Sequence, residues 1–199
     1  PRTLPRMQRP EATVLTRGDV RLEPLAPSHA EGLAAALEAD PAAFTVYSPT
    51  LGGSTLEGWI AQALADAEAG TRMPFTVLGE GVVAGSSSYL DIAPADGRIE
   101  IGHTWYGGPW QGTTLNPCAK LLLMEHAFDV LGATRVQLKT DARNERSRRA
   151  IAGVGATFEG VLRKHSRRAD GPGLRDVAMF SVTDDEWPRV QALLARRLA

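Results

Sequence analysis

Residues 98–117 read RIEIGHTWYGGPWQGTTLNP, and this stretch indicates the fold more clearly than any other part of the chain. Its first half, Arg98 to Trp105, has the apolar and polar pattern of a strand. Side chains alternate along a strand, so Glu100, Gly102 and Thr104 are expected to share one face. The stretch therefore begins with a strand that carries a carboxylate and two small residues together.

The second half of the stretch predicts a loop followed by a helix. Gly107-Gly-Pro109 ends the strand, and Asn116 followed by Pro117 is typical of a helix start, with asparagine as N-cap. Unpaired N–H groups at a helix N-terminus form an anion site. Additional donors or charge are expected from the side chains of Thr113, Thr114, Asn116 and Lys120. An ordinary strand–helix loop is the alternative, since many such loops contain these residue types.

Basic residues gather downstream of this loop. The segment 143–168 contains only two acids, Glu145 and Glu159, against Arg143, Arg146, Arg148, Arg149, Arg163, Lys164, Arg167 and Arg168. A strip of this kind suits a ligand with several phosphates. A solvated face of a helix and a strand is an equally good interpretation of the same residues.

The rest of the chain alternates between helical and strand patterns. Helices are expected near 28–37, 54–70, 116–132, 144–154 and 184–198, and strands near 20–25, 75–78, 82–90, 98–105, 135–140, 158–166 and 174–182. This order predicts an α/β fold, a mixed sheet covered by helices. The 199 residues contain no repeat or linker, so we expect one domain over 16–199 after a flexible tail over 1–15.

Composition excludes several classes of protein. The single cysteine, Cys118, excludes a disulfide framework and a multi-thiolate metal site, and the four histidines lack metal-ligand spacing, so no metal is expected. A net charge of −1 gives no general reason to expect nucleic acid. No apolar run approaches ~18 residues, and residues 1–10 do not look like a signal peptide. We therefore expect a cytoplasmic protein without a membrane segment.

Several spaced blocks resemble GNAT acetyltransferases, and more narrowly the branch that acetylates N-terminal amines of ribosomal proteins. The blocks are Glu100-Ile-Gly-His-Thr-Trp105, Gln111-Gly-Thr-Thr-Leu-Asn116, Arg135-Val-Gln-Leu-Lys139, Asp141-x-x-Asn144-x-x-Ser147, Gly155-Ala-x-x-Glu-Gly160-x-Leu-Arg163, Arg175-Asp176-Val-x-Met-Phe180-Ser and Glu186-Trp-Pro188. They follow one another in the family's order from about Val20 to the C-terminus. The resemblance implies a mostly antiparallel central sheet of about six or seven strands flanked by helices.

The resemblance also implies acetyl-CoA as cosubstrate and a set of residues that hold it. The strand end near Thr104 and the loop Gln111, Gly112, Thr113, Thr114, Leu115 and Asn116, with Lys120, would bind the pantetheine and pyrophosphate. Thr114 and Asn116 replace residues that are usually glycine or alanine, and non-glycine residues disfavour positive φ. Asn144 matches the position that holds the pantetheine arm. Ser147 matches the position proposed to protonate the departing thiolate.

The chemistry of amine acetylation suggests the remaining role. An α-amine of pKa about 8 is roughly 10% neutral at pH 7, whereas a lysine is under about 0.1% neutral. An N-terminal amine therefore needs only a weak base, and Glu100 is our candidate, with His165 a weaker one. The alternative for Glu100 is a strand carboxylate that is paired with an arginine. An N–H near Thr104 would stabilise the oxyanion. Tyr47 and Tyr106 are candidates to line the pocket.

Three functions remain open on the sequence alone. The acceptor amine belongs to a protein or peptide N-terminus, or to a small molecule such as a polyamine, amino acid or drug. The third function is a non-catalytic member that binds coenzyme A. The acceptor is expected to be read by loops such as Phe44–Gly53, which carry no decodable motif. A homodimer is a reasonable expectation because most soluble oligomers have two-fold symmetry.

Overall fold

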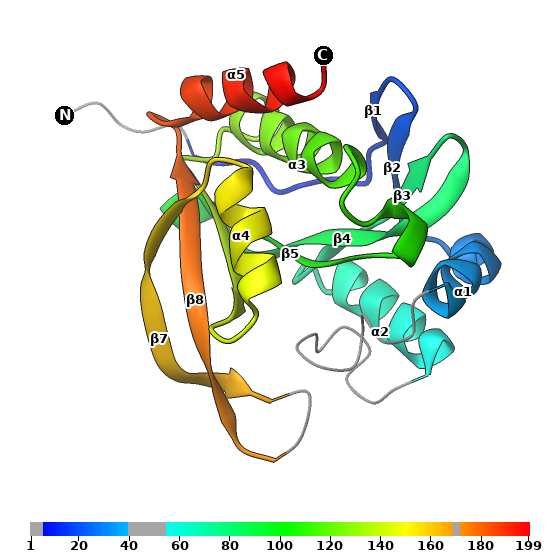
Figure 1. The fold of residues 1–199 in the computed structure, drawn as a ribbon. Coiled ribbons are helices and arrows are strands. Elements are labelled where there is room, and N and C mark those ends of the chain that lie inside the picture. The colour runs from blue at the N-terminus through cyan, green and yellow to red at the C-terminus, as the bar shows by residue number, and fades with distance from the viewer. Residues whose placement is uncertain (1–5, 40–54, 169–171) are drawn as a thin grey trace.

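The computed structural model describes residues 6–39, 55–168 and 172–199, and these form one eight-stranded sheet (Figure 1). The strand order is β1-β2-β3-β4-β5-β6-β8-β7. The strands are β1 Leu15–Arg17, β2 Val20–Pro24, β3 Met73–Gly79, β4 Val82–Ala93, β5 Arg98–Tyr106, β6 Arg135–Asp141, β7 Thr157–Arg167 and β8 Leu174–Thr183. Among the strands of the described residues, β5 and β6 are the one pair that runs parallel. The predicted mixed, mostly antiparallel sheet is confirmed. The strand that the sequence did not predict is β1, because its three residues are too few to show an alternating pattern.

Helices cover both faces of the sheet. They are α1 Ala30–Glu38, α2 Leu56–Glu68, α3 Leu115–Glu125, α4 Glu145–Gly153 and α5 Trp187–Arg197, and α3 continues as a π-helical turn to Val130. Figure 1 shows α1 and α2 together on one side and α3 and α5 together on the other. No helix in the described ranges is both long and apolar enough to cross a membrane.

Each face has its own hydrophobic cluster. Under α1 and α2, the side chains of Leu33, Trp59 and Ile60 pack against Trp105 of β5. On the opposite face, the larger cluster joins α3 and α5 to the sheet, with Leu121 and Leu194 completely buried. Burial of a large apolar side chain contributes roughly 1.5–3 kcal/mol, so both faces hold β5 firmly in the middle of the molecule.

The N-terminal segment packs more closely than expected. Met7 is only 2% exposed and belongs to the core. The Gln8 N–H donates to the Leu131 carbonyl at 2.8 Å, and Arg9 Nη1 donates to the Gly70 carbonyl at 3.1 Å. The expected tail over 1–15 therefore differs from the structure at these residues, which lie against the folded domain.

Candidate active site

The two parallel strands in the middle of the sheet pair over a short distance only. The β5–β6 ladder consists of Arg98 opposite Arg135, Ile99 opposite Val136 and Glu100 opposite Gln137. Beyond these pairs β5 continues to Tyr106 beside β4, and β6 continues to Asp141 beside β8. We call the region where β5 and β6 no longer pair, residues 101–106 and 138–141, the fork. In the fork the facing edges of β5 and β6 no longer bond each other, and a strand edge can offer donors and acceptors to a ligand.

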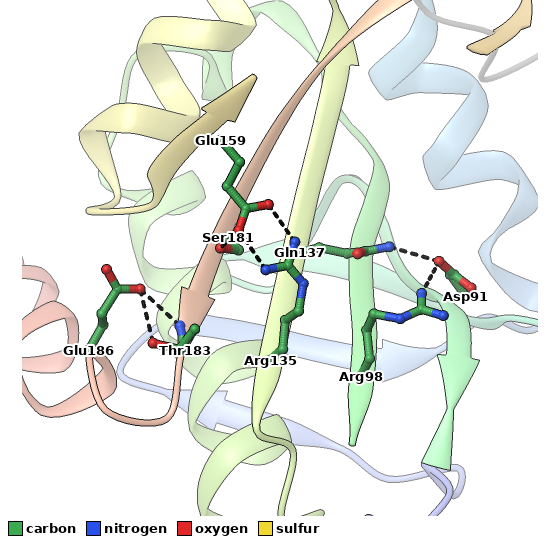
Figure 2. Close-up of polar contacts among 8 residues, drawn as sticks. All are labelled: Asp91, Arg98, Arg135, Gln137, Glu159, Ser181, Thr183 and Glu186. Atoms are coloured by element: carbon green, nitrogen blue, oxygen red, sulfur yellow. Dashed lines mark hydrogen bonds and ion pairs between the residues drawn. The ribbon is translucent and has the colours of Figure 1, made fainter. Parts of the chain in front are cut away.

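Polar side chains tie the strands together at the paired end of the fork (Figure 2). Gln137 Nε2 donates to Asp91 Oδ2 at 2.7 Å, and Arg98 of β5 pairs with the same carboxylate. These contacts connect β4, β5 and β6 directly beside the three paired positions. They fix the point from which the two strands separate.

A second group in Figure 2 extends this connection to β7 and β8. Arg135 forms a two-pronged pair with Glu159 at 2.6 and 2.5 Å, and Ser181 Oγ donates to Glu159 at 2.8 Å. The hydrogen bonds from Arg135 lower the pKa of Glu159, against a smaller opposing effect of burial. The paired end is therefore cross-linked over five strands while the fork itself stays open.

A β-bulge reshapes β5 inside the fork and corrects one sequence prediction. Ser88 pairs with Gly102 and Ser86 with Trp105, so His103 and Thr104 together stand opposite the single residue Ser87. His103 has φ 47, and bulges commonly need such a residue. The extra residue reverses the alternation of side chains. Thr104 consequently faces α3, and the prediction that it shares a face with Glu100 and Gly102 was wrong.

Glu100 lies where the fork begins. It is 1% exposed, and its Oε2 is 2.8 Å from Lys139 Nζ. The carboxylate extends along β5, because a Cβ added to Gly102 would lie 2.8 Å from Glu100 Oε1. Lys139 was not among the predicted site residues. Its place on β6 depends on the parallel pairing, which no local pattern reveals.

Lys120 points into the protein. It is 5% exposed, and its Nζ donates to Thr104 Oγ1 at 2.6 Å and to Ser87 Oγ at 3.4 Å. Thr104 and Ser87 share a hydrogen bond of 2.7 Å. Burial lowers the pKa of Lys120 from 10.5 to about 7. The structure thus places this amine beneath β4 and β5, behind Thr104.

The loop before α3 presents free donors. The backbone N–H groups of Gly112, Thr113, Thr114 and Asn116 have no acceptor among the described residues, whereas Leu115 N donates to Thr113 Oγ1 at 3.2 Å. These unpaired amides lie at the positive end of the α3 dipole. The arrangement fits an anionic group such as a pyrophosphate.

The helix start differs from the prediction by two positions. Thr114, not Asn116, is the N-cap, and the helix begins at Leu115. Thr114 has φ −72, so the family's glycine is not needed there for conformational reasons. Gly112 does adopt a positive φ of 75, and nothing lies within 4 Å of an added Cβ. The loop remains open in front of the free amides.

One residue of the basic strip contacts this loop. Gln111 Nε2 donates to the Tyr106 carbonyl at 2.8 Å, and Arg146 of α4 donates to Gln111 Oε1. Arg149, one turn further along α4, pairs with Glu145 at 3.3 Å. The remaining basic residues of the strip on β7 lie on the hairpin arm with β8, away from the loop in Figure 1. Arg146 is therefore the residue of the predicted strip for which the structure shows a contact with the loop.

The turn after β6 positions Asn144 and Ser147. Asn144 is the N-cap of α4, and its Oδ1 accepts from Ser147 N at 2.9 Å. Asp141 at the end of β6 accepts two hydrogen bonds from the Arg143 side chain, which lower its pKa. The cap leaves the Asn144 NH₂ group and the Ser147 hydroxyl available at the open end of the fork.

The remaining predicted site residues, His165, Tyr106 and Tyr47, have different positions in the structure. His165 is exposed on the edge strand β7. Tyr106 is buried, and burial raises the pKa of its hydroxyl. Tyr47 and the proposed acceptor loop Phe44–Gly53 lie outside the described residues.

Comparison with known proteins agrees with this geometry. A family model described as an acetyltransferase (GNAT) domain matches residues 19–157. A GCN5-related N-acetyltransferase from Brucella melitensis is 32% identical, with TM-score 0.84 over 98% of this chain and 89% of that one. A candidate acetyltransferase from T. thermophilus is 37% identical, with TM-score 0.81 over 94% of this chain and 97% of that one. No curated protein matched.

More distant structures share the fold. Mycobacterium smegmatis RimJ, solved with CoA-disulfide, is 21% identical with TM-score 0.77 over 89% of this chain and 88% of that one. The fork between β5 and β6, the free amides before α3 and the family match together identify the protein's class. The chain belongs to the GNAT family of acetyltransferases, whose cosubstrate is acetyl-CoA.

Proposed function

We propose that this acetyltransferase acetylates the N-terminal α-amine of a protein or peptide. The observation that carries the proposal is Glu100, a buried carboxylate at the start of the fork, held 2.8 Å from Lys139. A carboxylate is a weak base, which suffices for an α-amine but serves a lysine side chain poorly. The RimJ likeness supports the fold alone at its low identity.

Acetyl-CoA enters from the face that carries α3 and α4. The pyrophosphate binds the free amides of Gly112, Thr113 and Thr114, and Arg146 beside Gln111 adds a positive charge at the rim. The pantetheine arm passes along the fork, where Asn144 offers its NH₂ group. The thioester then lies between β5 and β6, near the bulge at His103 and Thr104.

Each reaction step has a group in this site. Glu100 accepts the proton of the attacking amine, directly or through a water molecule. The nitrogen bonds the thioester carbon, and an N–H of β5 near Thr104 stabilises the oxyanion. When the carbon–sulfur bond breaks, Ser147 donates its hydroxyl proton to the departing thiolate and regains one from solvent, and Glu100 releases to solvent the proton that it took from the amine. The products are the acetylated amine and coenzyme A.

An acceptor panel tests the proposal. Initial rates of thioester loss are measured with a lysine-free peptide bearing a free α-amine, the same peptide with a blocked N-terminus and one lysine, and small amines such as a polyamine. We expect turnover of the free α-amine, with mass spectrometry placing the acetyl group there. Turnover of the polyamine alone would contradict the peptide assignment. Acetyl-CoA binding without turnover of any amine would indicate a non-catalytic member.

A further inference from the structure

Arg72, just before β3, is a buried cation that the mechanism above does not use. It is 4% exposed, and its guanidinium lies 5.1 Å from the centre of the Trp59 ring of α2. Its Nε donates to Ser88 Oγ at 2.9 Å. Among the described residues no carboxylate forms an ion pair with it; Asp66 acts on it only at longer range. A buried cation without a close anion is unfavourable, so its retention calls for a partner.

Two hydrogen-bond donors in this contact lack acceptors. Arg72 Nη2 and Trp59 Nε1 are both shielded from solvent and bond nothing in the described part of the chain. Each unsatisfied buried donor costs roughly 1–3 kcal/mol, more when charged. The two side chains come from different elements, α2 and the start of β3, yet stack on each other. A planar anion with two oxygens matches such a pair of N–H donors.

The pair lies on the same face as Glu100. Ser88, which holds Arg72, stands directly opposite Gly102 on β5, and cross-strand partners project to one face of a sheet. Glu100 precedes Gly102 by two residues on that face, about 7 Å along the strand. Trp59 also contacts Trp105, with ring centres 6.3 Å apart. The donors therefore lie next to the carboxylate that receives the amine proton, on the side opposite α3.

The charges around this face favour an anion. Burial, helped by the positive charges of Arg72 and Lys139, lowers the pKa of His103 to about 4, so its ring is neutral at pH 7. Glu100 is already paired with Lys139. The positive charge of Arg72 therefore remains for a ligand.

We propose that the acceptor carries a carboxylate close to its reacting amine, and that Arg72 and Trp59 bind this carboxylate. The inference rests on the proposed acetyltransferase function, and it defines the acceptor more closely as an amine with a neighbouring carboxylate. The carboxylate belongs to an acidic N-terminal residue of a peptide or to a free amino acid. In both cases only a few bonds separate the amine from the carboxylate, which fits Arg72 and Glu100 lying on the same face of the sheet.

Matched acceptors test the inference. In the first arm, two peptides differ only in aspartate or asparagine at the N-terminus. In the second arm, kcat/KM for L-alanine is compared with kcat/KM for L-alaninamide, each calculated on the concentration of the neutral amine. We expect kcat/KM to favour the carboxylate by about 10- to 100-fold in at least one arm, the worth of a hydrogen bond to a charged group. Arg72→Gln should bring this ratio to within about threefold, and Trp59→Phe, which keeps an aromatic ring but removes the indole N–H, should lower it less. Arg149→Gln, an exposed arginine of α4, should keep the wild-type ratio.

The outcomes separate the inference from the proposed function. Turnover of both members of each pair without preference overturns the carboxylate site and leaves the acetyltransferase proposal intact. A preference that survives both Arg72→Gln and Trp59→Phe also overturns it. If the wild-type protein turns over none of the acceptors, both the carboxylate site and the proposed acetyltransferase function are overturned. Should Arg72→Gln fail to fold, the inference is tested by the wild-type preference for the carboxylate acceptor and by the decrease in that preference expected for Trp59→Phe.

Discussion

Several ionisable side chains lie almost completely buried around the strands that form the fork, among them Arg72, Glu100 and Lys120, which are 4%, 1% and 5% exposed. Glu100 was predicted as the base because of its place on the strand face with Gly102, and Lys120 was predicted as a positive charge one turn after the anion-binding loop. Arg72 was not, since it follows Thr71 in an ordinary turn and only tertiary pairing brings it to Ser88. The face of Thr104 was also unpredictable, because the bulge at His103 has no clear local signal.

The buried amine of Lys120 gives a test by stability. Burial lowers its pKa to about 7 in the folded protein from 10.5. Between these values the unfolded chain binds the extra proton, so the stability of the wild type rises with pH. We therefore expect Lys120→Met to have a higher free energy of unfolding than the wild type at pH 7. This difference should shrink by a few kcal/mol toward pH 10, because each pKa unit corresponds to about 1.4 kcal/mol. Urea unfolding of both proteins across this range measures it. A constant difference would show that Lys120 is charged in the folded state.

Ser147 is separable from the cap to which it belongs. Its N–H bonds Asn144 Oδ1 at 2.9 Å, and alanine keeps that N–H. We expect Ser147→Ala to change stability by within about 0.5 kcal/mol and to lower turnover on the order of 10²-fold. The control, Asn144→Ala, removes the cap and should cost about 1 kcal/mol. Unchanged turnover in Ser147→Ala would remove the hydroxyl from the mechanism.

At the scale of elements, the existence of the loop and helix proposed to bind the phosphates could be predicted, but not their boundaries. Asn116-Pro117 is a good helix start by composition, yet the chain enters α3 two residues earlier, at Leu115. Thr113 Oγ1 takes part in the turn by accepting from Leu115 N at 3.2 Å, which competes with the expected cap. The fork itself arises from non-local pairing, so a list of strands cannot reveal it.

Two arginines of α4 test the phosphate site as a matched pair. Arg146 contacts Gln111 at the loop, whereas Arg149 pairs with Glu145 on the exposed side of the helix. We expect Arg146→Ala to weaken acetyl-CoA binding by roughly threefold to tenfold, more at low salt, since a charge at the rim is screened by ions. Arg149→Ala should leave affinity unchanged. Calorimetric titration at two salt concentrations measures both, and equal effects of the two variants would argue against a site at the loop.

At the scale of the whole molecule, the sheet separates the two approaches that we propose for one reaction site. The loop before α3 and α4 lie on the face proposed for acetyl-CoA, whereas Glu100, Arg72 and Trp59 lie on the face under α2 that we propose for the acceptor. The class of fold followed from the alternation of elements, because each helix and strand needs a partner for its apolar face. The division into two approaches did not, because it depends on which side chains the bulge in β5 turns to each face.

The central claim is that amine and thioester meet in the fork, with Glu100 as base. The measurement is kcat/KM against pH for the wild type and Glu100→Gln, with a peptide α-amine as acceptor and acetyl-CoA affinity measured in parallel. We predict slower turnover at neutral pH with acetyl-CoA affinity nearly intact, and a loss that shrinks from about pH 8, where the α-amine is neutral without help. A loss that stays constant with pH, or a variant that no longer binds acetyl-CoA, would contradict the account.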